Sequence, residues 1–520
     1  MTDHQNHRSS STPPSLVWFR HDLRLSDNPA LAAAVARGGP VVCLYVLDDE
    51  TPGKWAHGSA SRWWLHHGLQ VLSEDLKALG SRLFLYRGRG GDVIADLAQA
   101  WGAGAVYWNR SYAPFDREPD SALKAALTAQ GIDAQSFNGN LISEPVRVRN
   151  KTGGVFKVFT PYWKTISAHP VDPPIPAPRT LPSPPSLPAK TAPLDLRDLS
   201  LLPTVPDWSA GLQASWTPGE AGAQARFEAF VASQGGLADY AEGRNRPDLD
   251  ACSRLSPFLK FGHISPRQVW HWTLHAMAAS PALEQSGWAF LREIGWREFS
   301  YYLLHHFPTL PSHNWRPEFD AFPWNQDREG YDAWCKGQTG YPMVDAGMRQ
   351  LWKTGWMHNR VRMITGSFLV KHQLLPWQMG ERWFWDTLVD ADIASNSAGW
   401  QWVAGCGADA SPYFRVFNPI TQGPKFDPEA RFIRSFVPEL ADLDDKSLFE
   451  PWNADLLLLQ AGGVTLGQTY PRPIVDHPAA RARALAAYET VKRSNTSPPP
   501  SASSSPSSPS SSKAEKAKAA

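Results

Sequence analysis

The run Val41-Val-Cys-Leu-Tyr-Val-Leu47 is wholly apolar and rich in β-branched side chains. Such a run is typical of a strand that is buried on both faces of a sheet. Shorter runs of the same kind occur at residues 16–19, 82–86 and 105–108. The sequence therefore predicts four buried strands in the N-terminal part of the chain.

Helical patterns lie between these strands. Asn28-Pro29 suits the N-cap and first position of a helix that runs through Val35, and residues 59–79 carry apolar side chains at helical spacing. Alternating strands and helices predict a parallel sheet with helices on both faces. Neither G-x-G-x-x-G nor G-x-x-x-x-G-K-[ST] follows any of these strands. We therefore expect a Rossmann-like, doubly wound α/β domain without the usual dinucleotide fingerprint.

The rest of the chain divides by composition. Residues 170–206 hold twelve prolines in 37 positions, which favours an extended connector. From about residue 218 the pattern is helical, and the C-terminal end is rich in Ser and Pro, which is typical of disorder. The expected parts are a disordered N-terminus (1–14), the α/β domain (15–145), a Pro-rich linker (146–217), a larger all-α domain (218–492) and a disordered tail (493–520).

Composition excludes several classes of protein. The chain has 520 residues, a formal net charge of +1 and four widely separated cysteines with no C-x-x-C pair. This excludes a disulfide framework, a zinc site built on cysteine and a cysteine-ligated iron–sulfur cluster. The start is polar and no apolar run approaches about 18 residues, so we expect neither a signal peptide nor a membrane span. We expect a cytoplasmic monomer with no metal and no membrane partner.

Tryptophan is the unusual residue. The chain has 24, and twelve of them lie between Trp288 and Trp402. Core packing, a stacking surface for bases and a route for electrons all require large aromatic side chains. The density alone does not choose between these three.

Two segments of the helical part combine polar and aromatic residues. Residues 340–372 contain five Lys or Arg and one acid, interleaved with aromatic residues, which suits either a phosphate-tracking surface or a solvated basic helix. Within it, Asn359 and Met363 are four apart and share a helical face. In Asp390-Ala-Asp-Ile-Ala-Ser-Asn396 the paired carboxylates suit metal binding, acid–base chemistry, or capping and salt bridges. No His or Glu stands at a metal-ligand spacing. The spacing alone does not choose between the remaining roles.

Five motifs follow one another along residues 15–490. They are Trp18-Phe-Arg-His-Asp-Leu-Arg-Leu-Ser-Asp-Asn28, Ser253-Arg-Leu-Ser256, Glu293-Ile-Gly-Trp-Arg-Glu-Phe299, the run 339–363 and the run 390–402. In content and order they resemble those of the photolyase/cryptochrome flavoproteins. The resemblance implies a two-domain fold with a folded-over FAD inside the helical domain.

The resemblance also implies which residues hold FAD. Arg362 would pair with Asp390 near the flavin ring, and Asn396 would face the flavin N5. Cys252 stands where the family usually has Thr, and because a thiol is the weaker donor, a backbone contact to phosphate is implied there. The whole implied set is Tyr240, Cys252, Ser253, Arg254, Leu255 and Ser256 at the phosphates, with Arg362, Asp390, Ala391, Asp392 and Asn396 at the ring and ribose.

Single positions imply which member of the family the chain resembles, namely a class I-like photolyase for cyclobutane pyrimidine dimers. Photolyases for cyclobutane pyrimidine dimers carry the residues that stand here as Glu293, Trp296, Asn359 and Met363. The (6-4) photolyases have His at the last two positions, and plant cryptochromes have Asp in place of Asn396. The resemblance thus implies blue-light repair of cyclobutane pyrimidine dimers in DNA, a carbon–carbon lyase reaction, with these four residues as the catalytic set. A flipped-out dimer needs such a slot, with apolar walls and polar groups for the base edges.

Electron transfer and DNA binding are implied in the same way. Excited, reduced FAD would give one electron to the dimer and recover it after the cyclobutane bonds break. Trp400, Trp377 and Trp324 match the chain of tryptophans that carries electrons to the flavin. The implied DNA contacts are Arg244, Arg360, Trp402, Arg415 and Gln422, with damaged DNA as the partner.

Two matters stay open from the sequence. Relatives with a methenyltetrahydrofolate antenna tend to have Glu where Trp108-Asn-Arg-Ser-Tyr-Ala-Pro114 has Ala113, so folate, a deazaflavin, a flavin and no antenna are all possible. The alternative function is a cryptochrome photoreceptor that signals through the Ser/Pro-rich tail. Asn396, Trp296 and Met363 argue against that alternative.

Overall fold

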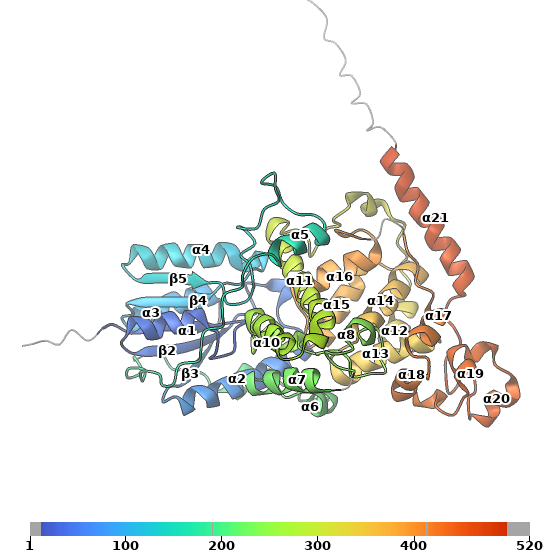
Figure 1. Cartoon of the computed structure of the whole chain (residues 1–520), viewed down its shortest axis with the longest axis horizontal. Coiled ribbons are helices and arrows are strands. Elements are labelled where there is room, and N and C mark those ends of the chain that lie inside the picture. The colour runs from blue at the N-terminus through green and yellow to red at the C-terminus, as the bar shows by residue number, and fades with distance from the viewer. Residues whose placement is uncertain (1–11, 190, 234, 411–413, 497–520) are drawn as a thin grey trace, which may run out of the picture.

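The N-terminal part of the computed structural model is a five-stranded parallel sheet (Figure 1). The structure describes residues 12–189, 191–233, 235–410 and 414–496. The sheet order is β3-β2-β1-β4-β5. The strands are β1 (Ser15–Phe19), β2 (Val41–Leu47), β3 (Leu83–Arg87), β4 (Ala105–Asn109) and β5 (Asp133–Phe137). All four neighbouring pairs are parallel, as the sequence predicts.

The first four strands confirm the prediction, and β5 was not predicted. Its sequence, DAQSF, is polar, and only Ala134 is buried, because β5 is an edge strand. An edge strand with a solvated face carries no continuous apolar run.

Helices cover both faces of the sheet, which confirms the α/β fold class. They are α1 (Pro29–Arg37), α2 (Ser59–Ala78), α3 (Gly90–Ala100) and α4 (Pro114–Ala129). The predicted N-cap is present, since the Asn28 side chain accepts from the Leu31 amide. Leu16, Val42 and Leu44 face α3 and α4, whereas Val17, Cys43 and Tyr45 face α1 and α2. Apolar side chains on both faces explain why the strands read as continuous apolar runs.

A long connector leads to the second part. It carries α5 (Phe159–Ile166) and a short 3-10 turn, η2 (Leu196–Leu199), and is otherwise mostly extended through its proline-rich stretch. The second part is largely helical, as expected (Figure 1). Its helices are α6 (Ala210–Ser215), α7 (Glu220–Ala232), α8 (Tyr240–Gly243), α9 (Ser256–Phe261), α10 (Pro266–Ala279), α11 (Glu284–His306), α12 (Arg328–Lys336), α13 (Pro342–Thr354), α14 (Asn359–Ser367), α15 (Trp377–Thr387), α16 (Ile393–Ala404), α17 (Pro419–Phe426), α18 (Arg431–Phe436), α19 (Asp445–Phe449), α20 (Leu456–Ala461) and α21 (His477–Thr496), with a π-helix, η5, at Phe368–His372.

The two parts share one core. The α2 side of the sheet and helices α7, α9 and α11 contribute to a single apolar cluster. Buried Arg24 donates to the Gly262 carbonyl oxygen at 2.9 Å, and Asp27 pairs with Arg267 at 2.8 Å. Gly262 adopts φ +68°, and a Cβ there would lie 2.1 Å from the His21 carbonyl oxygen, so the close approach requires glycine. This contact fixes α9 against the end of β1.

The C-terminal helix α21 runs to Thr496, a few residues into the segment predicted as tail. The rest of that tail, and residues 1–11 of the predicted disordered N-terminus, lie outside the described residues. Within the described ranges, no helix combines the length and apolar character that a bilayer span needs.

Candidate active site

A cavity of about 610 Å³ opens in the helical part. Helices α8, α9, α11, α14 and α16 and the loops before them supply its lining. All of the residues implied for FAD line it: Tyr240, Cys252, Ser253, Arg254, Leu255, Ser256, Arg362, Asp390, Ala391, Asp392 and Asn396. All four residues implied for the dimer line it too: Glu293, Trp296, Asn359 and Met363. Residues up to 156 positions apart in the sequence thus meet in one cavity.

The two carboxylates of the 390–392 motif have different tasks. Asp390 Oδ2 accepts from Arg362 Nη2 at 2.7 Å and from Ser256 Oγ at 2.6 Å, while its Oδ1 has no partner among the described residues. Asp392 is the N-cap of α16, since its Oδ1 accepts from the Ser395 amide and its Oδ2 from the Tyr301 hydroxyl. Capping and a salt bridge therefore account for the pair, and Asp390 Oδ1 is left as an unsatisfied acceptor.

Arg226 of α7 holds the backbone of the segment 252–256. Its guanidinium donates to the carbonyl oxygens of Cys252 at 2.7 Å and Ser253 at 2.9 Å, and pairs with Asp250. Arg254 adopts a left-handed φ of +51°, and its guanidinium lies 5.1 Å from the ring centre of Trp356. Such strain in a non-glycine residue is tolerated where surrounding contacts fix it.

The Cys252 thiol contacts a histidine. Its Sγ lies 3.4 Å from His358 Nε2, and His358 Nδ1 accepts from the Arg360 amide. Burial and nearby arginines lower the pKa of His358 to about 3, so the ring is neutral. Because Nδ1 accepts, Nε2 carries the proton and donates to the sulfur. Burial raises the pKa of Cys252 to about 11, which keeps it a thiol.

Glu293 and Trp296 each have a specific neighbour. Glu293 Oε1 pairs with Arg244 at 2.5 Å, so Arg244, expected to contact DNA, lies in the cavity beside the catalytic candidate. The Trp296 ring is stacked on Phe159 of α5, with centroids 3.7 Å apart and planes 10° apart. Asn359 is exposed at the first position of α14.

The Asn396 side chain has a fixed orientation. Its Nδ2 donates to the Glu381 carbonyl oxygen at 3.1 Å, and its Oδ1 accepts no hydrogen bond from the part of the chain that the structure describes. The Glu381 carboxyl is buried behind it and accepts from Ser397 Oγ at 2.5 Å. Burial raises the pKa of Glu381 to about 8.

The three tryptophans implied for electron transfer occupy different environments. Trp400 lines the cavity and is buried, with its Nε1 unpartnered among the described residues. Trp377 is fully buried outside the cavity lining and donates to Asn314 at 2.8 Å. Trp324 is partly buried against Phe322, with ring centroids 4.3 Å apart.

The expected DNA contacts divide into two groups. Arg244, Arg360 and Trp402 line the cavity, whereas exposed Arg415 and half-buried Gln422 lie outside the lining. The basic residues of 340–372 do not form one charged surface, which corrects the interpretation of this stretch as a phosphate-tracking surface. Arg349 pairs with Glu439 at 2.7 Å, Arg362 pairs with Asp390, and Lys371 is buried and donates to the Arg415 carbonyl oxygen.

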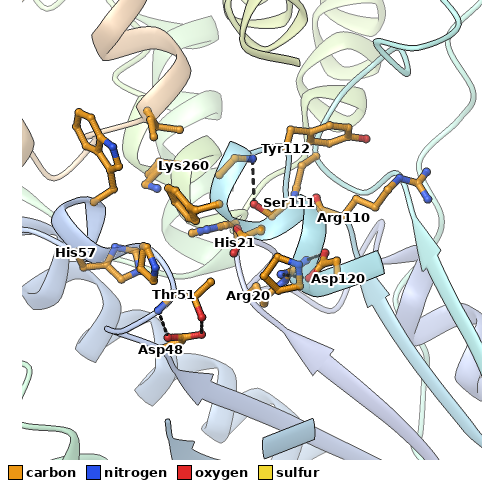
Figure 2. A pocket seen from close by; sticks show the side chains of 18 of the residues that line it. Arg20, His21, Asp48, Thr51, His57, Arg110, Ser111, Tyr112, Asp120 and Lys260 are labelled. Atoms are coloured by element: carbon orange, nitrogen blue, oxygen red, sulfur yellow. Dashed lines mark hydrogen bonds and ion pairs between the residues drawn. The ribbon is translucent and has the colours of Figure 1, made fainter. Parts of the chain in front are cut away.

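A second, smaller cavity of about 110 Å³ lies between the two parts (Figure 2). Figure 2 shows Arg20, His21, His57 and Arg110 from the α/β part together with Lys260 from α9. Burial lowers the pKa of His57 to about 3, with Lys260 and Arg62 adding to the effect. Ala113 of the antenna-like motif lines this cavity. Lys260 and Arg297 line both cavities, so one wall separates the two.

Sequence reasoning missed Arg226, Glu381, Lys260 and Phe159. None of the four lies in a segment that spacing singled out. Their roles come from contacts between distant elements, such as that of Phe159 with Trp296.

The lining of the larger cavity suits FAD. A flavin ring offers an N–H group to Asp390 Oδ1, which has no partner among the described residues, and the Asn396 Oδ1 faces the same cavity as a second acceptor. At the other end, Arg254 and the backbone of 252–256 suit phosphates, and the Arg254 Nε lies 3.3 Å from Asp250 Oδ1, which holds the guanidinium at the cavity wall. The donor and acceptor set thus matches the group.

Comparison with known proteins agrees with the division of the chain into an α/β part and a helical part. Residues 15–180 match a family model described as DNA photolyase, and residues 290–490 match one described as the FAD binding domain of DNA photolyase. The first match covers the sheet and the start of the connector, and the second covers most of the larger cavity.

Three relatives illustrate the similarity. A deoxyribodipyrimidine photo-lyase of Agrobacterium fabrum is 50% identical over 93% of this chain and 99% of its own length. Cryptochrome-1 of Arabidopsis thaliana is 39% identical over 90% of this chain and 69% of its own. The crystal structure of a bacterial class III photolyase from Agrobacterium tumefaciens superposes with a TM-score of 0.89 at 48% identity, covering 94% of this chain and all of that one.

Proposed function

The chain belongs to the photolyase/cryptochrome family, and from this premise we propose that it repairs cyclobutane pyrimidine dimers in DNA under blue light. One observation carries the proposal. Glu293, Trp296, Asn359 and Met363 line the same cavity as Asp390 and Asn396. A dimer held by the first four residues would thus lie beside a cofactor held by the other two.

The cavity wall has the chemistry that a flipped-out dimer needs. Trp296 and Met363 supply an apolar surface for the pyrimidine faces. Glu293 and Asn359 supply polar groups for the base edges. Arg244 holds Glu293 in place at 2.5 Å, so the carboxylate has a fixed position before substrate arrives.

When bound, fully reduced and light-excited FAD supplies one electron to the dimer and takes it back after ring opening. The residues of the chain hold and orient the reactants. Asp390 accepts a hydrogen bond at the ring, and Arg362 keeps that carboxylate in position. Asn396 presents Oδ1 and has no proton to titrate, so it accepts a hydrogen bond without protonating its partner. Trp400, Trp377 and Trp324 carry electrons inward from the surface.

The surrounding surface binds the DNA strand. Arg360 and Trp402 at the cavity, with Arg415 and Gln422 beyond it, contact backbone and bases next to the lesion. These contacts fix the register, and the cavity reads the lesion. Damaged DNA is therefore the partner, with little dependence on base sequence.

We assign the smaller cavity to a light-harvesting pigment. Its lining offers aromatic rings for a planar ligand and both cationic and carboxylate side chains for its polar groups, and Lys260 and Arg297 join its wall to that of the larger cavity. Denaturing the purified protein and identifying the released pigment distinguishes a folate, a deazaflavin and a flavin.

The similarity to Cryptochrome-1 supports a second candidate, a blue-light photoreceptor. The two functions differ in one measurement. Reduced protein and a dimer-containing oligonucleotide are illuminated, with a dark sample as control, and the thymine absorbance is followed. Light-dependent recovery supports the photolyase. No recovery from protein that holds reduced FAD would overturn it and leave the photoreceptor.

A further inference from the structure

The connector contacts the dimer site through the stacking of Phe159 on Trp296. Phe159 is the first residue of α5, in the connector between the sheet and the helical part. Its ring lies 3.7 Å from that of Trp296, with the planes 10° apart. One face of the Trp296 ring is therefore covered by Phe159, which leaves the rest of that side chain for the cavity it lines.

Phe159 is buried between Trp296 and other side chains. It is 0% exposed, and Trp163, one turn further along α5, is nearly parallel to it at 15°. The Trp163 ring lies against the backbone of α11, because a Cβ at Gly295 would be only 2.4 Å from it. The Trp296 ring therefore rests on a side chain that is itself held against α11, and its plane is set by α5.

The start of α5 is also held by a carboxylate from the segment that follows α16. The Phe159 amide donates to Asp409 Oδ2 at 3.1 Å, and no side chain of the connector caps this helix. Asp409 follows Trp402 by seven residues, in a segment that folds back on α16, where the Gly405 and Gly407 amides donate to the Gln401 carbonyl oxygen. Asp409 adopts φ +52°, a left-handed conformation in which Asp is enriched among non-glycine residues.

We propose that Phe159 and Asp409 are positioning residues for lesion recognition. Phe159 sets the plane of Trp296, and Asp409 ties Phe159 to the segment that follows Trp402. One residue of the connector thus contacts both a cavity-lining tryptophan of α11 and the segment that follows α16. This inference rests on the proposed function, because it concerns the slot that would receive the dimer.

The test compares discrimination in four variants. Dissociation constants are measured for a duplex with one thymine dimer and for the same duplex undamaged, together with the KM and kcat of repair. Phe159→Leu should weaken binding to the damaged duplex by about tenfold while binding to the undamaged duplex stays unchanged, since small misplacements of a positioning group are costly. KM should rise and kcat should stay near that of the unaltered protein.

Of the other three variants, one is a second test and two are controls. Phe156→Leu makes the same substitution at a buried ring that contacts Tyr162 and Tyr302 and not Trp296, so discrimination should persist. Asp409→Ala should lose discrimination, whereas Asp409→Asn keeps an acceptor for the amide and should retain it. If Phe159→Leu fails to fold, the comparison of Asp409→Ala with Asp409→Asn tests the positioning role.

The outcomes separate the two proposals. Unchanged discrimination in Phe159→Leu and Asp409→Ala, or an equal loss in Phe156→Leu, would overturn the positioning role while dimer repair stands. An unaltered protein that binds both duplexes equally would overturn both proposals.

Discussion

Arg362 donates to Asp390 across 2.7 Å, and the same carboxylate oxygen accepts from Ser256. Residues from three separate segments thus meet at one oxygen atom, and the other oxygen has no partner among the residues that the structure describes. The Asp390 side chain is 3% exposed and that of Arg362 is 26% exposed, so the pair is partly screened on the arginine side. Its main effect is to aim the free oxygen at the cofactor cavity.

We expect Asp390→Asn to lose FAD. The amide replaces the charged acceptor beside Arg362, which then lacks its counter-charge. Removing one partner of a buried ion pair costs about 3 kcal/mol of stability, and the cost is smaller here because Arg362 is partly exposed. The bound FAD per protein, measured from absorbance after gel filtration, should fall severalfold. Asp386→Asn, at an exposed residue that accepts from Ser59, should keep its FAD. Equal FAD in both variants would contradict the assignment of Asp390.

The fold was largely predictable from the sequence, and the reason is local. Strands buried on both faces are continuous apolar runs, and the Asn28-Pro29 pair marks the start of α1. The exposed edge strand β5 carries no such run. Boundaries in the connector were also harder, because α5 is held by contacts with α11 and Asp409 rather than by its own sequence.

For the site, motif residues were predictable and their supports were not. The resemblance named residues that line one cavity, including Asp390 and Asn396. The residues that support the motifs, such as Arg226 at Cys252 and Glu381 at Asn396, lie outside the motifs themselves. The basic stretch around Arg349 shows the converse, since a run of charge in sequence is divided among separate ion pairs in space.

Stability should fall as pH rises because of Glu381. Burial raises the pKa of this carboxyl from 4.5 to about 8, so between these values the folded state holds a proton that the unfolded state has lost. Each pH unit in that window costs up to about 1.4 kcal/mol. Glu381→Gln still accepts from Ser397 and removes the effect. The difference in thermal midpoint between the variant and the unaltered protein should therefore grow from pH 5 to pH 8, and a constant difference would contradict the buried, protonated carboxyl.

Trp400→Phe should separate two light reactions. Photoreduction of oxidised flavin should slow strongly, because the variant lacks the tryptophan that stands next to the flavin in the electron-transfer series. Repair by protein that is reduced beforehand should be largely intact. The two rates are measured by flavin absorbance and by thymine recovery. Trp270→Phe, at a buried tryptophan outside the cavity lining, should leave both unchanged. Loss of both reactions in Trp400→Phe would mean that the residue acts through packing.

Arg360→Ala should weaken DNA binding in a salt-dependent way. Its guanidinium lines the cavity and lies 4.4 Å from the Phe426 ring, so it is held at the expected DNA surface. Losing one phosphate contact should reduce the slope of log affinity against log salt by about 1. Arg349→Ala comes from the same sequence stretch but removes a residue paired with Glu439, and its slope should match that of the unaltered protein. An unchanged slope in Arg360→Ala would remove Arg360 from the phosphate contacts.

The identity of the lesion is the central claim, and one measurement tests it most directly. The reduced protein is illuminated with two oligonucleotides of the same sequence, one with a cyclobutane thymine dimer and one with a (6-4) photoproduct, and the restored thymines are separated by chromatography. Asn359 and Met363, in place of two histidines, predict repair of the dimer alone. Repair of the (6-4) photoproduct with the dimer left intact would contradict the account.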